Sequence, residues 1–574
     1  MQSNHAGKSA VTEHQGEKKL AEKKTWQIRY RGPLGRAFEK FCLHRLAETD
    51  FHLLLSPYRE KRGHLCGDQV MLWGMLVDCA LRLLPYLEGA EALEEKIRRS
   101  VSEMMSLQEE DGCISAFPRP LQLQGLDLPG RRYVLNALLR AAAMPEADEK
   151  IKECCLRMTD QLISLVGRDK RPVIYCGNCG GLDASAILDS VVGVYRLTKE
   201  KRVLEFARYI AASGCSQQHN IFSAFKSGME PRLLGNGNAV GLTDCFRGVA
   251  ELCKVDPASA AEYKKLCQLY MERINAEELF ITGAGGGGNS SGTLWCRGAY
   301  RQTESSCAGG PMGSTQVTTA CLQYFAALTA LTDPLQPFAL AERSFYNAFL
   351  GAWNEKKLCW DHLEPTPLTT ARRYSSPADT SLYDLLRGAE ALALFPEMAM
   401  VPIENGAVLN FYEDLEAQIP RKAMIRVTGG YPGSTKAHIS IRSRTPFTIS
   451  MRIPDYCKGV YYLDSLLAWQ KNSYLTITRP WDADEILTLE FDSKVKTHYP
   501  PDDSRYQAFT RAGIVLAADE RQAQIEDSMT LLWRNKLAFV DYASAGKPAD
   551  CGAKFNVWFT KLFPKYLFHY TDKD

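Results

Sequence analysis

The sequence has no long hydrophobic run and almost no net charge. Nowhere do 18 consecutive apolar residues occur, so we expect no membrane-spanning helix. With 69 lysines and arginines against 67 aspartates and glutamates, the formal net charge of +2 gives no electrostatic case for binding nucleic acid or a membrane surface. A neutral partner such as a sugar fits this balance.

The features of a secreted protein are also missing. Residues 1–24 are polar and lysine-rich, without the apolar stretch of a secretory signal. The 18 cysteines are too few among 574 residues for a disulfide scaffold, and many fall inside apolar helical patterns. We therefore expect a disordered tail over 1–30, free buried thiols and a cytoplasmic location.

Sequence signals for a cofactor are weak. Cys176 and Cys179 form a CxxC pair, but no second CxxC or HxxxH pair lies at zinc-finger spacing. The glycine run GAGGGGNSSG (283–292) lacks the GK[ST] ending of a phosphate-binding loop and the context of a dinucleotide site. We interpret it as a flexible loop over a cleft, and expect neither a metal nor a nucleotide cofactor.

Two hydrophobic periods divide the chain. Over 31–399, apolar residues recur every three or four positions, which predicts paired helices forming a toroid of helical hairpins. From 400 to 545 the period is two, which predicts an antiparallel β-sandwich. We thus expect an α+β multidomain fold and leave 546–574 unassigned. The clearest helical segments are 70–87, 92–108, 131–142, 186–198, 242–255, 261–274, 318–331 and 381–395, and the clearest strands are 437–442, 447–452, 474–479 and 486–491.

Several segments follow one another in a characteristic order between about residues 60 and 520, among them RRYVLNALLRA (131–141) in the helical part and FTISMRIPDY (447–456) in the strand part. In them the chain resembles glycoside hydrolase family 127, the β-L-arabinofuranosidase-type family. The resemblance implies a six-hairpin (α/α)6 toroid followed by β-sandwich domains, and a small carbohydrate substrate. The segments include LQEEDGC (107–113), RRYVLNALLRA (131–141), ELFITGAGGG (278–287), FTISMRIPDY (447–456) and FTRAGIVLA (509–517).

The family's catalytic residues do not carry over. Most members use a zinc-bound cysteine nucleophile and a glutamate acid/base, and no glutamate follows ITG (281–283) here. The family segment HMQETCVTVTWM matches PMGSTQVTTACL (311–322), which places Ser314 at the glutamate and Gln316 at the cysteine. The resemblance is therefore to a divergent member without the zinc site, since the later CC pair falls on Thr380-Ser381 or Ser375-Ser376.

A second alignment places QTESSC (302–307) on the same family segment, with Glu304 as the acid/base. It requires an insertion, because AGGPMG (308–313) cannot continue a helix. We expect the helix to begin at Ser314, a favourable N-cap, with Glu304 on the loop that leads to it.

Hydrolysis without a cysteine needs two carboxyl groups, one protonated and one ionised. We predict Glu304, Asp361 and Asp379 as catalytic candidates, although each also fits a solvated loop residue or a helix cap. Asp68 and Asp183 flank helices and are interpreted as caps. The side chains predicted to contact a sugar, the aromatic ones fitting a protein core equally well, are Trp295, Tyr300, Ser314, Gln316, Trp360, His362 and Glu364.

Three functions stay open at this point. The leading hypothesis is a zinc-independent hydrolase that cleaves a small glycoside or oligosaccharide with carboxylates. Loss of the family's glutamates and cysteines favours instead a catalytically silent carbohydrate-binding relative. An epimerase or lyase on the same toroid would need a histidine or tyrosine base, for which His362 is the best placed.

Overall fold

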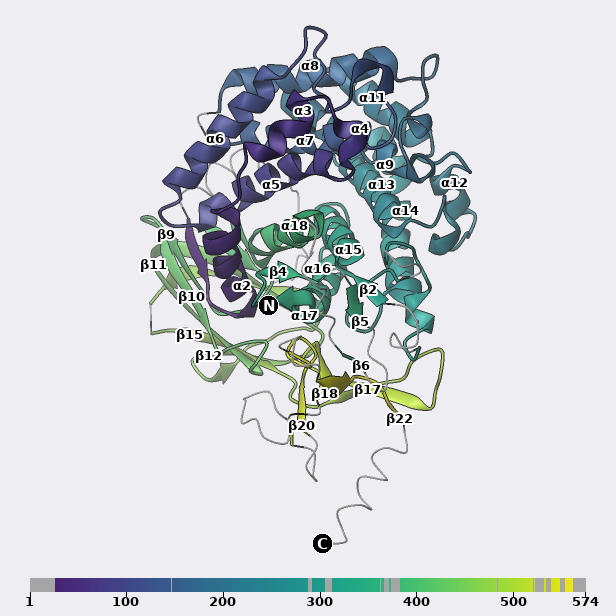
Figure 1. The fold of residues 1–574 in the computed structure, drawn as a ribbon. Coiled ribbons are helices and arrows are strands. Elements are labelled where there is room, and N and C mark those ends of the chain that lie inside the picture. Colours follow the sequence, from purple (N-terminus) through teal and green to yellow (C-terminus); the bar gives the residue numbers. More distant parts are fainter. Residues whose placement is uncertain are drawn as a thin grey trace.

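A computed structural model describes residues 26–560, with gaps at 146, 288–291, 305–311, 362, 366–370, 373–381, 483, 520, 522–530, 533–537 and 548–552. A ring of helices is followed by sheets that are antiparallel apart from one parallel pair of strands, which confirms the predicted fold class (Figure 1). Among the described residues, no helix is long and apolar enough to cross a membrane.

Six helices of the described chain form the inside of the ring. Each contacts the next, and the sixth returns to contact the first, so the ring is closed (Figure 1). Helix α5 buries residues on nearly every side, among them Trp73 and Val77. The inner helices in ring order are α5 (Gln69–Leu83), α7 (Asp127–Ala142), α10 (Leu188–Thr198), α13 (Ala239–Cys253), α15 (Thr315–Leu328) and α18 (Leu382–Ala399).

Outer helices cover this ring. They are amphipathic: in α6 the buried residues Leu93, Ile97, Val101 and Met104 are spaced three or four apart, while most others face solvent. The partner of α18 is α2 (Pro33–Phe41), from the beginning of the chain. The other inner helices are each followed by their outer partner, in order α6 (Glu91–Ser106), α8 (Glu149–Leu165), α11 (Lys201–Ala212), α14 (Pro257–Arg273) and α16 (Leu335–Arg343).

A buried carboxylate fixes α2 in place. The Oε1 atom of Glu413 accepts a hydrogen bond from Gly35 N (2.6 Å), and Oε2 accepts one from Leu34 N (3.2 Å), both in the first turn of α2. Gly32 permits this approach, because an added Cβ there would lie 2.0 Å from Glu413 Cγ. Burial raises the pKa of Glu413 to about 8, although the two donors favour the charged form.

Ten described strands make the first sheet, and β11 joins its two layers. The first half of β11 pairs with β10 and β15, and its second half with β14 and β8, with a register shift between Ser443 and Phe447. The separately predicted strands 437–442 and 447–452 are therefore one strand. The ten are β1 (Gln27–Tyr30), β7 (Met400–Ile403), β8 (Gly406–Leu409), β9 (Leu415–Ile419), β10 (Ala423–Thr428), β11 (Lys436–Ile453), β12 (Cys457–Tyr462), β13 (Ser465–Leu466), β14 (Ser473–Trp481) and β15 (Ile486–Phe491).

Strand β1 departs from the sequence prediction. Its residues were expected to end the disordered tail over 1–30, but they pair antiparallel with β9. Ile28 and Tyr30 point into the core, while Gln27 and Arg29 are exposed. Four alternating residues are too few to indicate a strand in a polar segment.

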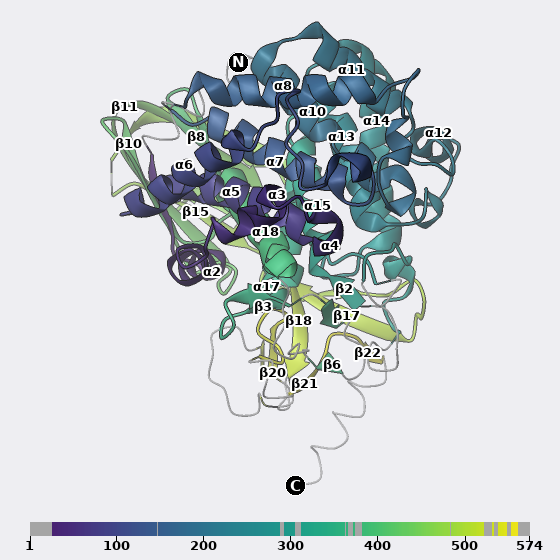
Figure 2. The same ribbon diagram turned by 45° about the horizontal axis from the view of Figure 1, so that its top comes forward.

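A second sheet of eight described strands lies below the ring in Figure 1. It includes two strands from the segment 546–574 that the sequence left unassigned: β21 pairs with β18, and β22 with β17. Figure 2 shows this sheet on the side of the molecule away from α8. Its strands are β6 (Ala371–Arg372), β16 (Lys496–His498), β17 (Tyr506–Arg511), β18 (Ile514–Asp519), β19 (Leu531–Leu532), β20 (Ala538–Asp541), β21 (Lys554–Asn556) and β22 (Phe559–Thr560).

Candidate functional site

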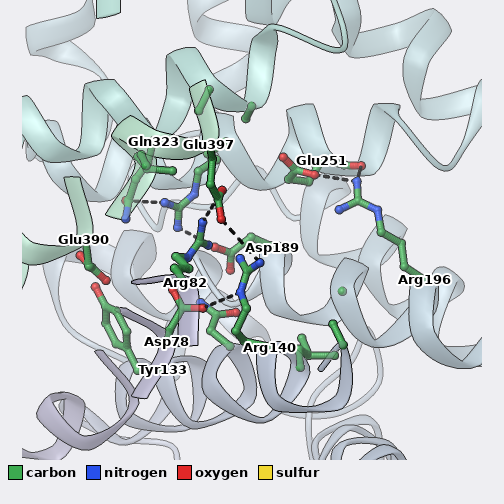
Figure 3. A pocket seen from close by; sticks show the side chains of 18 of the residues that line it. Asp78, Arg82, Tyr133, Arg140, Asp189, Arg196, Glu251, Gln323, Glu390 and Glu397 are labelled. Carbon is green, nitrogen blue, oxygen red and sulfur yellow. Dashed lines mark hydrogen bonds and ion pairs between the residues drawn. The ribbon is translucent and has the colours of Figure 1, made fainter. Parts of the chain in front are cut away.

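The six inner helices run in the same direction. Residues mostly from their C-terminal halves line one cavity of about 510 Å³, to which all six contribute (Figure 3). Their first turns therefore lie together at the opposite end of the ring, which we call the N-terminal face.

Paired charges line the cavity (Figure 3). Although burial alone would raise it, Lys254 and Arg196 lower the pKa of Glu251 to about 2. Several pairs join neighbouring inner helices, so they hold the wall of the ring together. Arg82–Asp78 lies within α5. The pairs that join neighbouring inner helices include Arg82–Glu397, Arg140–Asp78, Arg196–Glu251 and Arg247–Asp189.

On the N-terminal face, two carboxylates come from adjacent helices. Asp68 directly precedes α5, and Asp384 lies in the first turn of α18, which packs against α5. Gln316, in the first turn of α15 on the other side of α18, donates from Nε2 to Asp384 Oδ1 (2.8 Å). The sequence-predicted contact residue Gln316 thus orients a carboxylate that sequence reasoning did not single out.

Asp68, the other carboxyl group of the pair, has a raised pKa. Asp68 is exposed, but the protein around it desolvates its carboxyl group in part and the charge of Asp384 adds repulsion, so both raise the pKa of Asp68. Two nearby carboxyls in different environments are the arrangement in which one holds a proton while the other is charged. Asp68 was interpreted from sequence as a helix cap, yet its side chain makes no cap hydrogen bond to α5.

The buried side chain of Arg387 supports the backbone of Gln316, the residue that orients Asp384. Arg387 Nη2 donates to the backbone oxygen of Gln316 (3.2 Å), and Nη1 donates to Tyr133 Oη (3.2 Å) and forms an ion pair with Glu390. Tyr133 and Glu390 both line the cavity in Figure 3, so Arg387 connects the two ends of the ring. The first turn of α15, which carries Gln316, is thereby held rigidly.

Three predicted positions gather at the beginning of α15. Ser314 ends β2 (Met312–Ser314), which pairs with β5 (Leu363–Pro365), and its N–H donates to Gly285 O (2.9 Å). Thr315 Oγ1 donates to the backbone oxygen of Asp361 (2.5 Å), which places the buried Asp361 beside the same turn. Glu364 joins through its backbone, opposite Gly313. The predicted helix start at Ser314 is confirmed, since α15 begins at Thr315.

The predicted tryptophans belong to the core. Trp360 is fully buried and stacks on Phe349, with ring centroids 5.1 Å apart. Gly388 in α18 makes room for it, because a Cβ there would lie 2.3 Å from the Trp360 ring. Trp295 is also buried and donates from Nε1 to Tyr270 Oη (3.2 Å). Neither indole is exposed to stack on a sugar in this structure.

Glu304 lies on the surface. Arg301 pairs with it through Nε (2.8 Å) and Nη2 (2.5 Å), and this interaction lowers the pKa of Glu304. An ionised carboxylate of this kind is suited to orienting an arginine rather than to donating a proton. Tyr300 is exposed, with the guanidinium of Arg297 over its ring. Asp379, His362 and the Glu364 side chain lie outside the described residues.

The zinc chemistry implied by the resemblance does not fit the residues present. At the positions assigned to the family's glutamate and cysteine, Ser314 and Gln316 offer a hydroxyl and an amide, and Gln316 already binds Asp384. Burial raises the pKa of Cys321, in the same helix, to about 12, so its thiol stays protonated. Within the described ranges, no three histidine, cysteine, aspartate or glutamate side chains gather as a metal site requires.

Comparisons with known proteins agree on the fold. No family model and no curated protein matches the sequence. Among solved structures, a GH127 β-L-arabinofuranosidase from Geobacillus stearothermophilus T6 superposes with a TM-score of 0.69 at 13% identity, covering 93% of this chain and all of the other. A GH127 β-arabinofuranosidase superposes with a TM-score of 0.69 at 14% identity, over 94% of this chain and 97% of its own. A further glycoside hydrolase gives a TM-score of 0.68 at 13% identity, over 94% of this chain and 98% of its own. The likeness to family 127 that the sequence segments indicated is thus confirmed as a shared fold: the chain is built like a GH127 glycoside hydrolase.

Proposed function

We propose that the protein hydrolyses a glycosidic bond, with Asp68 as the proton donor and Asp384 as the ionised carboxylate. One observation carries the proposal: Asp384 is oriented by Gln316 and lies close enough to Asp68 to raise the pKa of that carboxyl. A raised pKa shifts Asp68 toward its protonated form, and a protonated group is what the leaving oxygen of a glycoside requires. The glycoside-hydrolase fold supports a carbohydrate substrate.

In the proposed reaction, Asp68 gives its proton to the glycosidic oxygen as the bond to the anomeric carbon breaks, and the leaving sugar departs as an alcohol. Asp384 serves the anomeric carbon, either as a nucleophile or as the base that takes a proton from attacking water. Water supplies the new hydroxyl group. If Asp384 is the nucleophile, the remaining proton of that water goes to Asp68 directly; if Asp384 is the base, it takes this proton and Asp68 is reprotonated through solvent exchange, so one water molecule is consumed in either case. Gln316 and Arg387 position Asp384 and touch no reacting atom.

Turnover of a panel of aryl glycosides by the purified full-length protein tests this proposal. We expect activity that resists a chelator and falls at least about 100-fold in both Asp68→Asn and Asp384→Asn. Loss in Asp68→Asn should be smaller for nitrophenyl leaving groups, which need little protonation, than for poor leaving groups. Circular dichroism establishes that each variant is folded.

Glu304→Gln is the matched control. It removes a surface carboxylate predicted from sequence as catalytic and should leave turnover nearly unchanged. The proposal would be overturned if Asp68→Asn and Asp384→Asn kept full activity while Glu304→Gln lost it. That result would identify Glu304 as the proton donor. The roles of Asp361 and Asp379 stay predictions, which the same panel tests with their asparagine variants.

A second candidate function is carbohydrate binding without turnover. It is favoured by the replacement of the family's glutamate and cysteine by Ser314 and Gln316. Saturable sugar binding by a protein that turns over no member of the panel would support it. Under that outcome Asp68 and Asp384 would be ligands for sugar hydroxyls, and their variants would weaken binding.

A further inference from the structure

Three arginines converge on a surface pocket of about 400 Å³. Arg232, Arg297 and Arg301 line it together with Tyr300, Trp295 and Cys296. Arg232 follows α12 (Ile221–Lys226), while the other two flank the short helix η9 (Gly298–Tyr300). The pocket therefore brings together guanidinium groups from two separate stretches of the chain.

Arg297 is held in an unusual backbone conformation. Its φ of 57° lies in the left-handed region, which residues with a side chain rarely adopt. The buried Glu278 maintains this conformation, since its Oε2 accepts a hydrogen bond from Arg297 N (2.6 Å). The guanidinium of Arg297 then lies over the Tyr300 ring, 4.6 Å from its centroid. Strain of this kind is kept where a side chain must point in one direction.

The pocket has more positive than negative charge. Among the described residues, Arg232 Nε pairs with Glu230 (2.7 Å) and Arg301 with Glu304, so the three arginines are balanced by two glutamates, one half-buried and one exposed. Arg297 Nε is buried and has no hydrogen-bond acceptor in the described structure, the Glu230 oxygen being 3.9 Å away. The rest of the Arg297 side chain, which is 41% exposed, is the part that a ligand in the pocket can reach.

The pocket belongs to the same end of the ring as the two aspartates. Leu294 forms a bridge with Asn238, the N-cap of α13, and Trp295 N donates to Gly237 O (3.0 Å). Gly285, earlier in the same segment, bonds to Ser314 at the beginning of α15. Residues that line the pocket thus directly follow contacts with the N-terminal face.

We propose that this arginine pocket binds the carboxylate or phosphate group of an acidic sugar. Planar guanidinium groups bind two oxygens of such a group at once, and the excess positive charge favours an anion over a neutral sugar. As a statement of substrate class the inference rests on the proposed hydrolysis, but the binding itself does not require turnover.

Isothermal titration of the full-length protein with glucuronate, glucose 6-phosphate, inorganic phosphate and glucose tests the pocket. We expect glucuronate or glucose 6-phosphate to bind more tightly than glucose, with an affinity that falls as salt increases. Arg297→Gln and Arg232→Gln should each weaken acidic-sugar binding about tenfold or more, whereas Arg99→Gln on the exposed face of α6 should not. The acidic sugar that binds more tightly shows whether the pocket prefers a carboxylate or a phosphate group.

Several outcomes would overturn the inference. They are equal binding of glucose and the acidic sugars, unchanged affinity in both arginine variants, or inorganic phosphate binding as tightly as either acidic sugar. Repeating the titration with Asp384→Asn separates the two proposals. Retained acidic-sugar binding in that variant supports the pocket whether or not the protein proves to be a hydrolase.

Discussion

Replacing Glu413 by glutamine tests whether a buried proton stabilises the junction between α2 and the sheet. The Glu413 side chain is buried and accepts two backbone hydrogen bonds from the first turn of α2. Its ordinary pKa of 4.5 is raised to about 8 by burial. The folded protein therefore keeps a proton that the unfolded chain releases above pH 4.5.

The sign and size of the effect follow from this difference. The proton on Glu413 contributes its full share of the unfolding free energy below pH 4.5. This contribution is lost progressively as the pH rises through 8. Because one pKa unit corresponds to about 1.4 kcal/mol, the full loss is about 5 kcal/mol of unfolding free energy. Glutamine cannot ionise, so the stability of Glu413→Gln should not fall over this range, and relative to the wild type it should gain nearly that amount between pH 5 and pH 9. Near pH 5 the variant should be the less stable of the two, because its amide nitrogen cannot accept one of the two backbone N–H bonds.

Urea denaturation at pH 5, 7 and 9, followed by circular dichroism and fluorescence, measures the difference. Glu404→Gln is the matched control, since Glu404 is an exposed glutamate of the same sheet region and its variant should follow the wild type. Parallel stability profiles for wild type and Glu413→Gln would refute the assignment of the buried proton to Glu413.

Three further predictions concern other parts of the molecule. Gly388→Ala should lower stability by about 1–3 kcal/mol, because the new methyl meets the buried Trp360 ring; an unchanged melting temperature would contradict this. Asp384→Asn should lower the pKa of Asp68 by removing charge repulsion, which ¹³C NMR of the labelled carboxyl measures; an unmoved titration would show that the two groups do not interact. Iodoacetamide should modify the partly exposed Cys66 well before the buried thiols of the described chain, and uniform labelling of the native protein would contradict the packing.

Most of the fold could be predicted from the sequence because its signals are local and long. The helical period of 70–87 is found again in α5, and the period of two over 437–442 and 447–452 in β11. What could not be predicted depends on distant contacts. Nothing local indicates that the two predicted strands are continuous, or that Gln27–Tyr30 pair with β9 far along the chain.

The candidate site also has a part that local sequence signals indicate and a part that depends on contacts between distant residues. Resemblance to family 127 directed attention to Ser314 and Gln316, and the structure places both at the first turn of α15. Asp68 was interpreted as a cap, because an aspartate at a helix start is most often one, and Asp384 was not singled out. Their significance comes from the packing of α18 against α5, a contact between residues that are far apart in sequence. To find this pair of aspartates from the sequence alone, one would have to know that α18 and α5 are neighbours in the closed ring.

Closure of the ring by α2 reverses the usual order of folding during synthesis. Of the helices that form the ring, this one leaves the ribosome first, yet the carboxylate that accepts its amide hydrogen bonds lies 378 residues further along. Until Glu413, which lies just before β9, has been made, the sixth hairpin lacks its outer member, and the apolar side of α18 stays uncovered there. Folding from the N-terminus, the common expectation for large chains, therefore cannot complete this ring. Nascent chains that stop near residue 400 should require chaperones, and the earliest helix synthesised should be among the last to gain protection from proteases.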